Sequence, residues 1–154
     1  MIRIFLPCSF FLTLAVLIPT GSLASPAPLL AEYCQKSMAD FPSKFDENLI
    51  RSACEKTEVF PDCYSVNKAA IFHYDKRATK PNAKNILVFS LIHGDEAPAG
   101  SAGRFWMERL ESIDPRNNWR VVPILNPDGF KLKTRTNAHK IDLNRNFPTT
   151  DWTE

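Results

Sequence analysis

The stretch FSLIHGDEAPAG, residues 89–100, changes abruptly from an apolar run to a histidine and two acids. Imidazole nitrogen and carboxylate oxygen are both zinc ligands, and a catalytic zinc typically takes three protein ligands and keeps one position for water. His93 and Glu96 can reach one ion if the backbone curls as it leaves a strand, and Gly94 favours such a curl because glycine adopts angles that other residues resist. The alternative is a polar strand end in which Asp95 or Glu96 caps a helix.

A second polar segment, KTRTNAHKIDLNRNFP at residues 133–148, carries Arg135 and Arg145, with Asn144 beside the latter. A guanidinium presents a planar fork that fits a carboxylate, and it can also steady a developing oxyanion. Arginine and asparagine clustered near a metal would suit a substrate with a free carboxylate or an amide carbonyl. An ordinary salt-bridged surface loop is the alternative.

Strands and a helix must position these segments. The continuous apolar and β-branched run at residues 85–92 predicts a strand buried on both faces. Residues 99–113 predict a helix ended by Asp114-Pro115. Its core-facing side chains should be Phe105, Trp106, Leu110 and Ile113. Residues 118–126 predict another buried strand, in which a proline marks a bulge.

Strand, helix and strand in this order predict a β-α-β unit with parallel strands. The polar clusters at 93–96 and 126–129 follow the two strands directly. Ligands of open α/β sheets bind just outside the carboxyl ends of the strands. We therefore expect both clusters at one edge of the sheet, with Asn126-Pro127-Asp128-Gly129 forming a turn.

The N-terminal part of the chain precedes this unit. Residues 1–24 have an arginine, an apolar run too short to span a membrane and a small-x-small site, which together predict a signal peptide cleaved after Ala24 or, alternatively, Ala27. An uncleaved membrane anchor is the other interpretation. Residues 25–68 are interpreted as an N-terminal adapter that contains a helix within 43–57. The short run at 69–75 predicts a first strand.

Three cysteines remain after removal of the signal peptide: Cys34, Cys54 and Cys63. Export to a periplasm or to the outside makes one disulfide possible. Either Cys54–Cys63 or Cys34–Cys54 could form, and the sequence does not choose between them. The absence of a Cys-x-x-Cys pair argues against a cysteine zinc site.

Composition restricts the partners of the protein. The chain of 154 residues has a formal net charge of +2 and is 44% hydrophobic, values typical of one globular domain. No block of like charges stands out, so nucleic-acid binding is not expected. We expect contact with a membrane only through the signal peptide.

Four motifs in order, IHGDE, NPDG, TRTN and DLNRNFP, together resemble the zinc metallocarboxypeptidases of the carboxypeptidase A type, over roughly residues 65–152. The closest variant is the bacterial murein peptide amidase branch. The resemblance implies an α/β fold with a mixed, mostly parallel sheet flanked by helices. It further implies that His93 and Glu96 bind Zn²⁺, that Asn144 and Arg145 hold the substrate carboxylate, and that Arg135 stabilises the oxyanion.

The chain departs from the family pattern at two points. Lys140 stands where family members usually have glycine, which costs more if the backbone there needs a positive φ. The third zinc ligand and the general-base glutamate of the family lie downstream of DLNRN, and neither His73 nor His139 stands in a matching context. Residues 69–154 are therefore interpreted as the N-terminal half of a peptidase domain, from a fragment, a truncated product or an incomplete record. Such a half would leave a strand edge and apolar helix faces exposed.

The expected function is zinc-dependent hydrolysis of an amide or peptide bond next to a free carboxylate, by a murein peptide amidase or a carboxypeptidase. The expected substrate is a murein peptide or another peptide with a free carboxylate. One alternative is an N-acyl amino acid deacylase of the aspartoacylase-like type, which shares a similar His-x-x-Glu. Another is a non-catalytic fragment that binds zinc or peptide ends.

Overall fold

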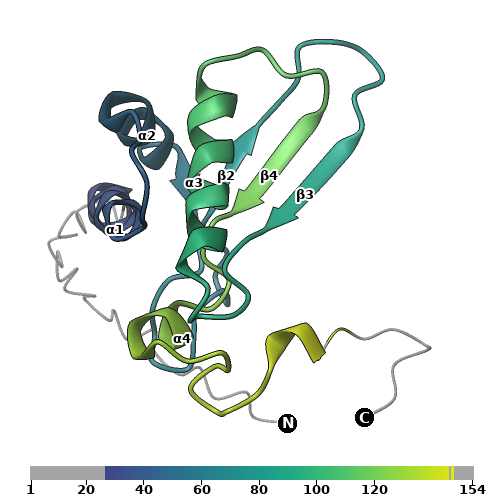
Figure 1. The fold of residues 1–154 in the computed structure, drawn as a ribbon. Coiled ribbons are helices and arrows are strands. Elements are labelled where there is room, and N and C mark those ends of the chain that lie inside the picture. Colours follow the sequence, from purple (N-terminus) through teal and green to yellow (C-terminus); the bar gives the residue numbers. More distant parts are fainter. Residues whose placement is uncertain (1–26, 146, 148–154) are drawn as a thin grey trace, which may run out of the picture.

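The computed structural model describes residues 27–145 and residue 147. Two helices come first in the described chain, three strands follow, and a third helix then separates the third strand from the fourth (Figure 1). In order they are α1 (Ala27–Ala39), α2 (Glu47–Cys54), β1 (Thr57–Glu58), β2 (His73–Lys76), β3 (Asn85–Phe89), α3 (Ala97–Glu111), β4 (Asn118–Val122), α4 (Pro127–Leu132) and the 3-10 turn η1 (Leu143–Arg145). The predicted signal peptide at 1–24 lies outside the described residues. Among the described helices, none is both long and apolar enough to cross a membrane.

The four strands form one sheet in the order β1-β2-β4-β3, which confirms the mixed α/β class. β3 and β4 are parallel, with Phe89 opposite Val122. The sheet is not mostly parallel, however, because β1–β2 and β2–β4 pair antiparallel in the described part of the chain. The connection between β2 and β3, residues 77–84, contains no helix. It is too short for the crossover of a dozen or more residues that parallel strands require.

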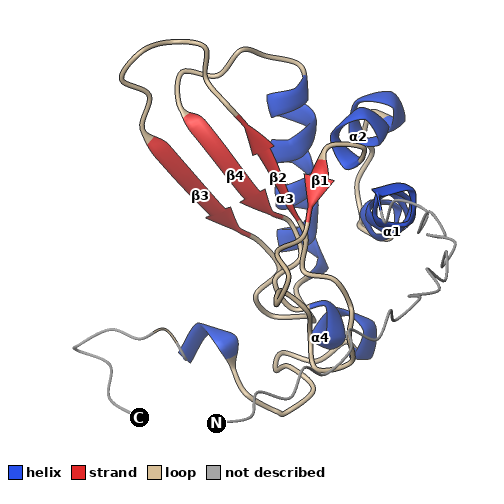
Figure 2. Ribbon diagram, turned by 180° about the vertical axis from the view of Figure 1, so that it is seen from behind, coloured by secondary structure: helices blue, strands red, loops and turns tan. Residues whose placement is uncertain are grey.

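The strand β3 lies at the sheet edge, and the prediction that it is buried on both faces is wrong. Alternate residues face solvent, with Leu87 56% and Phe89 40% exposed. Figure 2 shows the reason: α3 lies behind the sheet in this view, and no described helix covers the near face. The expected exposed strand edge is therefore present.

The helix α3 covers the other face and confirms the predicted helix, beginning two residues earlier than expected. Its buried residues include Gly103, Met107 and Leu110, which follow a spacing of three and four. Phe105 falls off this stripe and is 59% exposed, contrary to expectation. An exposed apolar side chain on this helix agrees with the expectation of partly uncovered helix faces.

The N-terminal helices share one hydrophobic core with the sheet. Cys34 and Met38 from α1, Ile50 from α2 and Val121 from β4 belong to one cluster of buried side chains. Of the two disulfides that the sequence allowed, the structure contains Cys34–Cys54, which joins α1 to the end of α2, and Cys63 is free. The periodicity around 43–57 correctly predicts α2, while α1 was not predicted.

The side chain of Arg104 fastens this N-terminal segment to α3. It is 2% exposed. Its guanidinium donates at 2.6–3.2 Å to the carbonyl of Met38 at the end of α1 and to three carbonyls of the α1–α2 connection, those of Phe41, Pro42 and Ser43. The same group lies 4.2 Å from the centre of the Phe45 ring. The connection thus satisfies its carbonyls through a charge buried in α3.

Candidate metal and substrate site

The two polar clusters lie side by side at the carboxyl ends of β3 and β4, as the β-α-β pattern predicts. Beyond the strands, Leu125 N donates to Ser90 O at 3.0 Å and Asn126 N donates to Leu91 O at 3.1 Å. Leu91 has a φ of 50°, which is unusual for a bulky residue. The chain leaves β3 at this bend and then presents His93.

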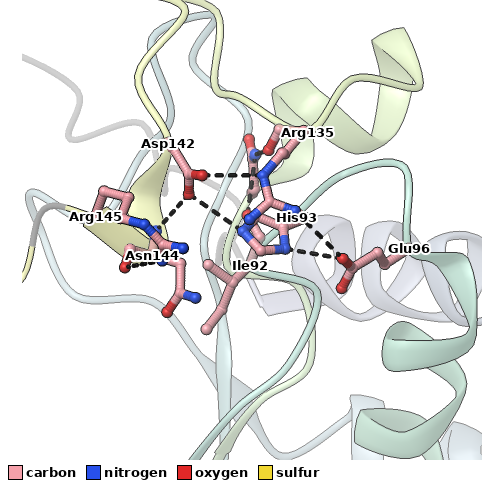
Figure 3. A network of polar contacts seen from close by, with 8 residues as sticks. Ile92, His93, Glu96, Arg135, Asp142, Asn144 and Arg145 are labelled. Carbon is pink, nitrogen blue, oxygen red and sulfur yellow. Dashed lines mark hydrogen bonds and ion pairs between the residues drawn. The ribbon is translucent and has the colours of Figure 1, made fainter.

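His93 lies between two carboxylates. Its Nδ1 is 3.0 Å from Glu96 Oε1, and its Nε2 is 3.2 Å from Asp142 Oδ1. The residue is 7% exposed, whereas 54% of the Glu96 side chain is exposed. Figure 3 shows His93 between these two acids. The ring is therefore fixed by Asp142 on one side and faces Glu96 with its other nitrogen.

This pair fits part of a zinc site. Two ligands at zinc bond lengths and tetrahedral angles lie roughly 3.3 Å apart, close to the observed 3.0 Å between His93 Nδ1 and Glu96 Oε1. The other ring nitrogen of a zinc-binding histidine usually donates to a carboxylate, a backbone carbonyl or a water, and Asp142 lies in that place. Within the described residues, however, no group of three or more histidine, cysteine or acidic side chains is arranged to hold a metal.

The other two histidines lie in different settings. His73 is buried on β2, stacks on Phe60 with ring centres 4.5 Å apart and has no hydrogen-bond partner for Nε2. His139 is exposed in the loop before η1, in agreement with its interpretation as a surface histidine. Neither has a polar side-chain contact with His93 or Glu96 among the described interactions.

Arg135 reaches the same cluster from the loop after α4. Its Nε donates to Asp142 Oδ2 at 2.9 Å, and its Nη1 is 3.7 Å from Glu96 Oε1. The side chain is 46% exposed, so its guanidinium borders both carboxylates and solvent (Figure 3). A negative charge that developed beside Glu96 would therefore lie close to the positively charged guanidinium of Arg135.

Asp142, which is not among the site residues predicted from the sequence, connects these residues. One oxygen accepts from Asn144 N and contacts His93, while the other accepts from Arg135. Desolvation acts to raise the pKa of Asp142, but hydrogen bonds from Arg135, Asn144 N and His93 together lower it below its ordinary value. The available signal was its position in DLNRN, two residues before the asparagine that was selected.

Asn144 and Arg145 lie on η1, on the far side of Asp142 from Glu96 (Figure 3). Both are exposed, and Arg145 Nη1 donates to the carbonyl of Asn144 at 3.2 Å. No described side-chain contact joins them to His93 or Glu96. The structure thus brings His93, Glu96 and Arg135 together, while the predicted role of Asn144 and Arg145 stays a prediction.

Gly94 is important for a different reason from the one expected. None of the described glycines has a positive φ. A Cβ on Gly94 would instead lie 1.9 Å from the backbone carbon of Gly129. The loop after β3 therefore presses directly on the first turn of α4, and only glycine allows this approach.

The predicted turn at 126–129 is the start of α4. Asn126 is the N-cap, accepting from Gly129 N at 2.9 Å, and Pro127 follows it inside the first turn. This is a usual helix start. The capping side chain accepts a hydrogen bond from a free backbone N–H, and proline at the first helical position has no N–H that requires an acceptor. Further along, Lys140 has a φ of 63°, so the condition under which lysine costs more than glycine is met.

This region is similar both to a desuccinylase and aspartoacylase family model and to individual amidases and carboxypeptidases. Residues 82–153 match the family model of the succinylglutamate desuccinylase/aspartoacylase catalytic domain. The murein peptide amidase A of Vibrio campbellii is 37% identical over 68 residues, which is 44% of this chain and 27% of the relative. The carboxypeptidase SOL1 of Arabidopsis thaliana is 57% identical over 71 residues, covering 37% of this chain and 14% of the relative.

Solved structures give the same result. The murein-tripeptide amidase MpaA of Escherichia coli O157 superposes with a TM-score of 0.50 at 27% identity, covering 77% of this chain and 43% of that one. A metallo-carboxypeptidase of Pseudomonas aeruginosa gives a TM-score of 0.52 at 28% identity, covering 64% and 29%. The chain therefore spans about a quarter or less of the curated relatives named above, and less than half of these solved chains.

Proposed function

We propose, from the similarity of part of this chain to zinc metallocarboxypeptidases of the carboxypeptidase A type, that its His93 cluster is part of the site of a zinc-dependent amide hydrolase. The substrate would be a peptide with a free carboxylate, such as a murein peptide. The family is one of hydrolases, and the relatives named above are amidases and carboxypeptidases.

A single observation carries the proposal. His93 has a carboxylate on Nε2 and directs Nδ1 at a second carboxylate 3.0 Å away. A salt-bridged turn would not need a buried histidine oriented in this way. A carboxylate behind a zinc-binding histidine fixes its tautomer and raises its basicity, and the arrangement suits that purpose.

His93 and Glu96 would hold the zinc, which supplies a Lewis acid for the scissile carbonyl and lowers the pKa of a bound water. Arg135 would stabilise the negative oxygen that develops on the carbonyl, since it is cationic and already borders Glu96. Arg145 and Asn144 would fix the register of the substrate by binding its carboxylate. We assign the general base and the third zinc ligand to none of the residues described.

Zinc binding tests this proposal directly. We expect the wild-type chain to bind zinc, and His93→Ala with Glu96→Ala to abolish the binding, as measured by equilibrium titration with zinc. His139→Ala is the matched control, because it removes an exposed histidine outside the pair. An unchanged zinc content in the double variant would refute the metal site.

The substrate class is tested with matched ligands. Arg145→Ala should weaken binding of a peptide with a free carboxylate about tenfold or more, and leave its C-terminal amide analogue unaffected. Equal losses for both peptides would contradict the assigned role. The deacylase alternative is not favoured by the names of the relatives, although the matching family model includes aspartoacylase. Preference for an N-acyl amino acid over the peptide would revive it.

We also propose that the protein is exported to a periplasm or secreted. The signal-like residues 1–24 motivate this, and the Cys34–Cys54 disulfide supports it, because disulfides persist in oxidising compartments. Fractionation of cells that express the tagged full chain, with N-terminal sequencing, tests it. Recovery of an uncleaved chain from the cytoplasm would contradict export.

A further inference from the structure

The side chain of Asn126 is buried at the junction of three segments. It is 1% exposed. Its Oδ1 accepts from Gly129 N at 2.9 Å, which caps α4. Its Nδ2 donates to two carbonyls that do not belong to that helix, Ile92 O at 3.2 Å and Arg135 O at 3.4 Å.

The two carbonyls belong to the segments that carry the candidate site. Ile92 directly precedes His93, and Arg135 is the predicted oxyanion residue. The capped turn between them also receives the backbone contact of Gly94 on Gly129, and Thr134 N donates to Gly129 O at 2.9 Å. One amide thus holds the backbone of a candidate metal ligand and that of a candidate cation to the same helix end.

Capping alone does not account for an asparagine at this position. Serine, threonine or aspartate would accept the Gly129 N–H equally well. Only an amide side chain offers an acceptor on one atom and two donor hydrogens on the other. Each donor hydrogen has a carbonyl to meet, one from the His93 segment and one from the Arg135 segment. Capping therefore accounts for Oδ1 of Asn126 but not for its Nδ2 donor.

We propose that Asn126 is a positioning residue that sets the distance between the His93 segment and the Arg135 segment. The inference rests on the proposed function, in which these segments carry a zinc ligand and the oxyanion residue. Loss of the Nδ2 donor would separate the two carbonyls while leaving the helix cap in place. Removing a residue that orients a metal ligand through hydrogen bonds typically weakens metal binding 10–100-fold.

Asn126→Asp tests this because it keeps the shape and the capping acceptor and turns the donor into an acceptor. Asn126→Ser keeps the cap without a buried acid, and serves if the aspartate variant does not fold. We expect a zinc Kd raised about tenfold or more, measured by competition with a chelator. We also expect faster amide hydrogen exchange, confined to residues 93–96 and 134–136. Asp46→Ala, which removes the cap of α2, should lower Tm and leave both readouts unchanged.

The outcomes separate the two proposals. Wild-type zinc affinity and exchange in a folded Asn126→Ser chain would overturn the positioning role. So would a loss of protection confined to α4 with unchanged zinc Kd, since that is what weakening of the α4 cap alone would produce. Zinc binding that does not depend on His93 would overturn the proposed function instead. The exchange readout needs no metal, so it would still decide the role of Asn126.

Discussion

The helical end and the strand-end site of this protein are stabilised in opposite ways. At the helical end, a disulfide and a buried arginine hold α1, α2 and α3 together, and the side chains between them are closely packed. At the site, short loops meet through single hydrogen bonds and glycine contacts. Three non-glycine residues adopt positive φ there, Leu91, Lys133 and Lys140, whereas Ser43 is the one that does so in the described α1–α2 connection.

This difference indicates at which end a substitution should lower the free energy of unfolding and at which end it could raise it. At the helical end, the disulfide and the buried guanidinium of Arg104 stabilise the fold, and most substitutions there would remove these contacts. The site contains backbone strain, which costs about 1–3 kcal/mol for each such residue and persists only where the surrounding structure enforces it. Removing contacts at the helical end should therefore lower the free energy of unfolding, whereas relieving backbone strain at the site should raise it.

The largest effect is expected at Arg104. Arg104→Met keeps much of the volume but leaves the four carbonyls at the end of α1 and in the α1–α2 connection without this donor. We expect a loss of about 3–5 kcal/mol in the free energy of unfolding, from urea denaturation. Arg109→Met on the exposed side of the same helix is the control and should change it little. A loss below about 1 kcal/mol would show that water replaces the guanidinium.

The disulfide comes next. Cys34→Ser with Cys54→Ser opens a cross-link between residues 20 apart in sequence. Because the cross-link restricts the unfolded chain, we expect a loss of about 3 kcal/mol, measured as a lower Tm. Cys63→Ser removes the free cysteine and should have little effect. The zinc Kd should stay unchanged in the folded double variant. A clearly raised zinc Kd would show that the disulfide also affects the site, so that the two ends are not independent.

The smallest effect, and one of opposite sign, is expected at Lys140. Lys140→Gly places a residue without Cβ at a φ of 63° and should stabilise the chain by up to about 1 kcal/mol. Lys131→Gly, in the exposed part of α4, is the matched control and should destabilise it by a similar amount. Equal losses in both variants would mean that Lys140 makes contacts that outweigh its strain.

The sequence predicted the strand-end placement of the site well. An apolar run followed by His93, and a second run followed by Asn126, were sufficient, because parallel strands bring their carboxyl ends together. Asp142 and the Nδ2 bonds of Asn126 were not predictable. These contacts join residues far apart in the sequence, and local residue spacing does not predict which loop returns to which strand end. Periodicity failed for the same reason at β3, where the number of covered faces is set by neighbouring elements.

The contact between His93 and Asp142 also has a consequence for the order of events in folding. The two residues are 49 positions apart, so during synthesis His93 leaves the ribosome well before its partner exists. Closing a connection of that length costs chain entropy, which only the finished β-α-β unit can offset. The oriented histidine is thus a late product of folding, and the metal that we propose would bind after the sheet has formed.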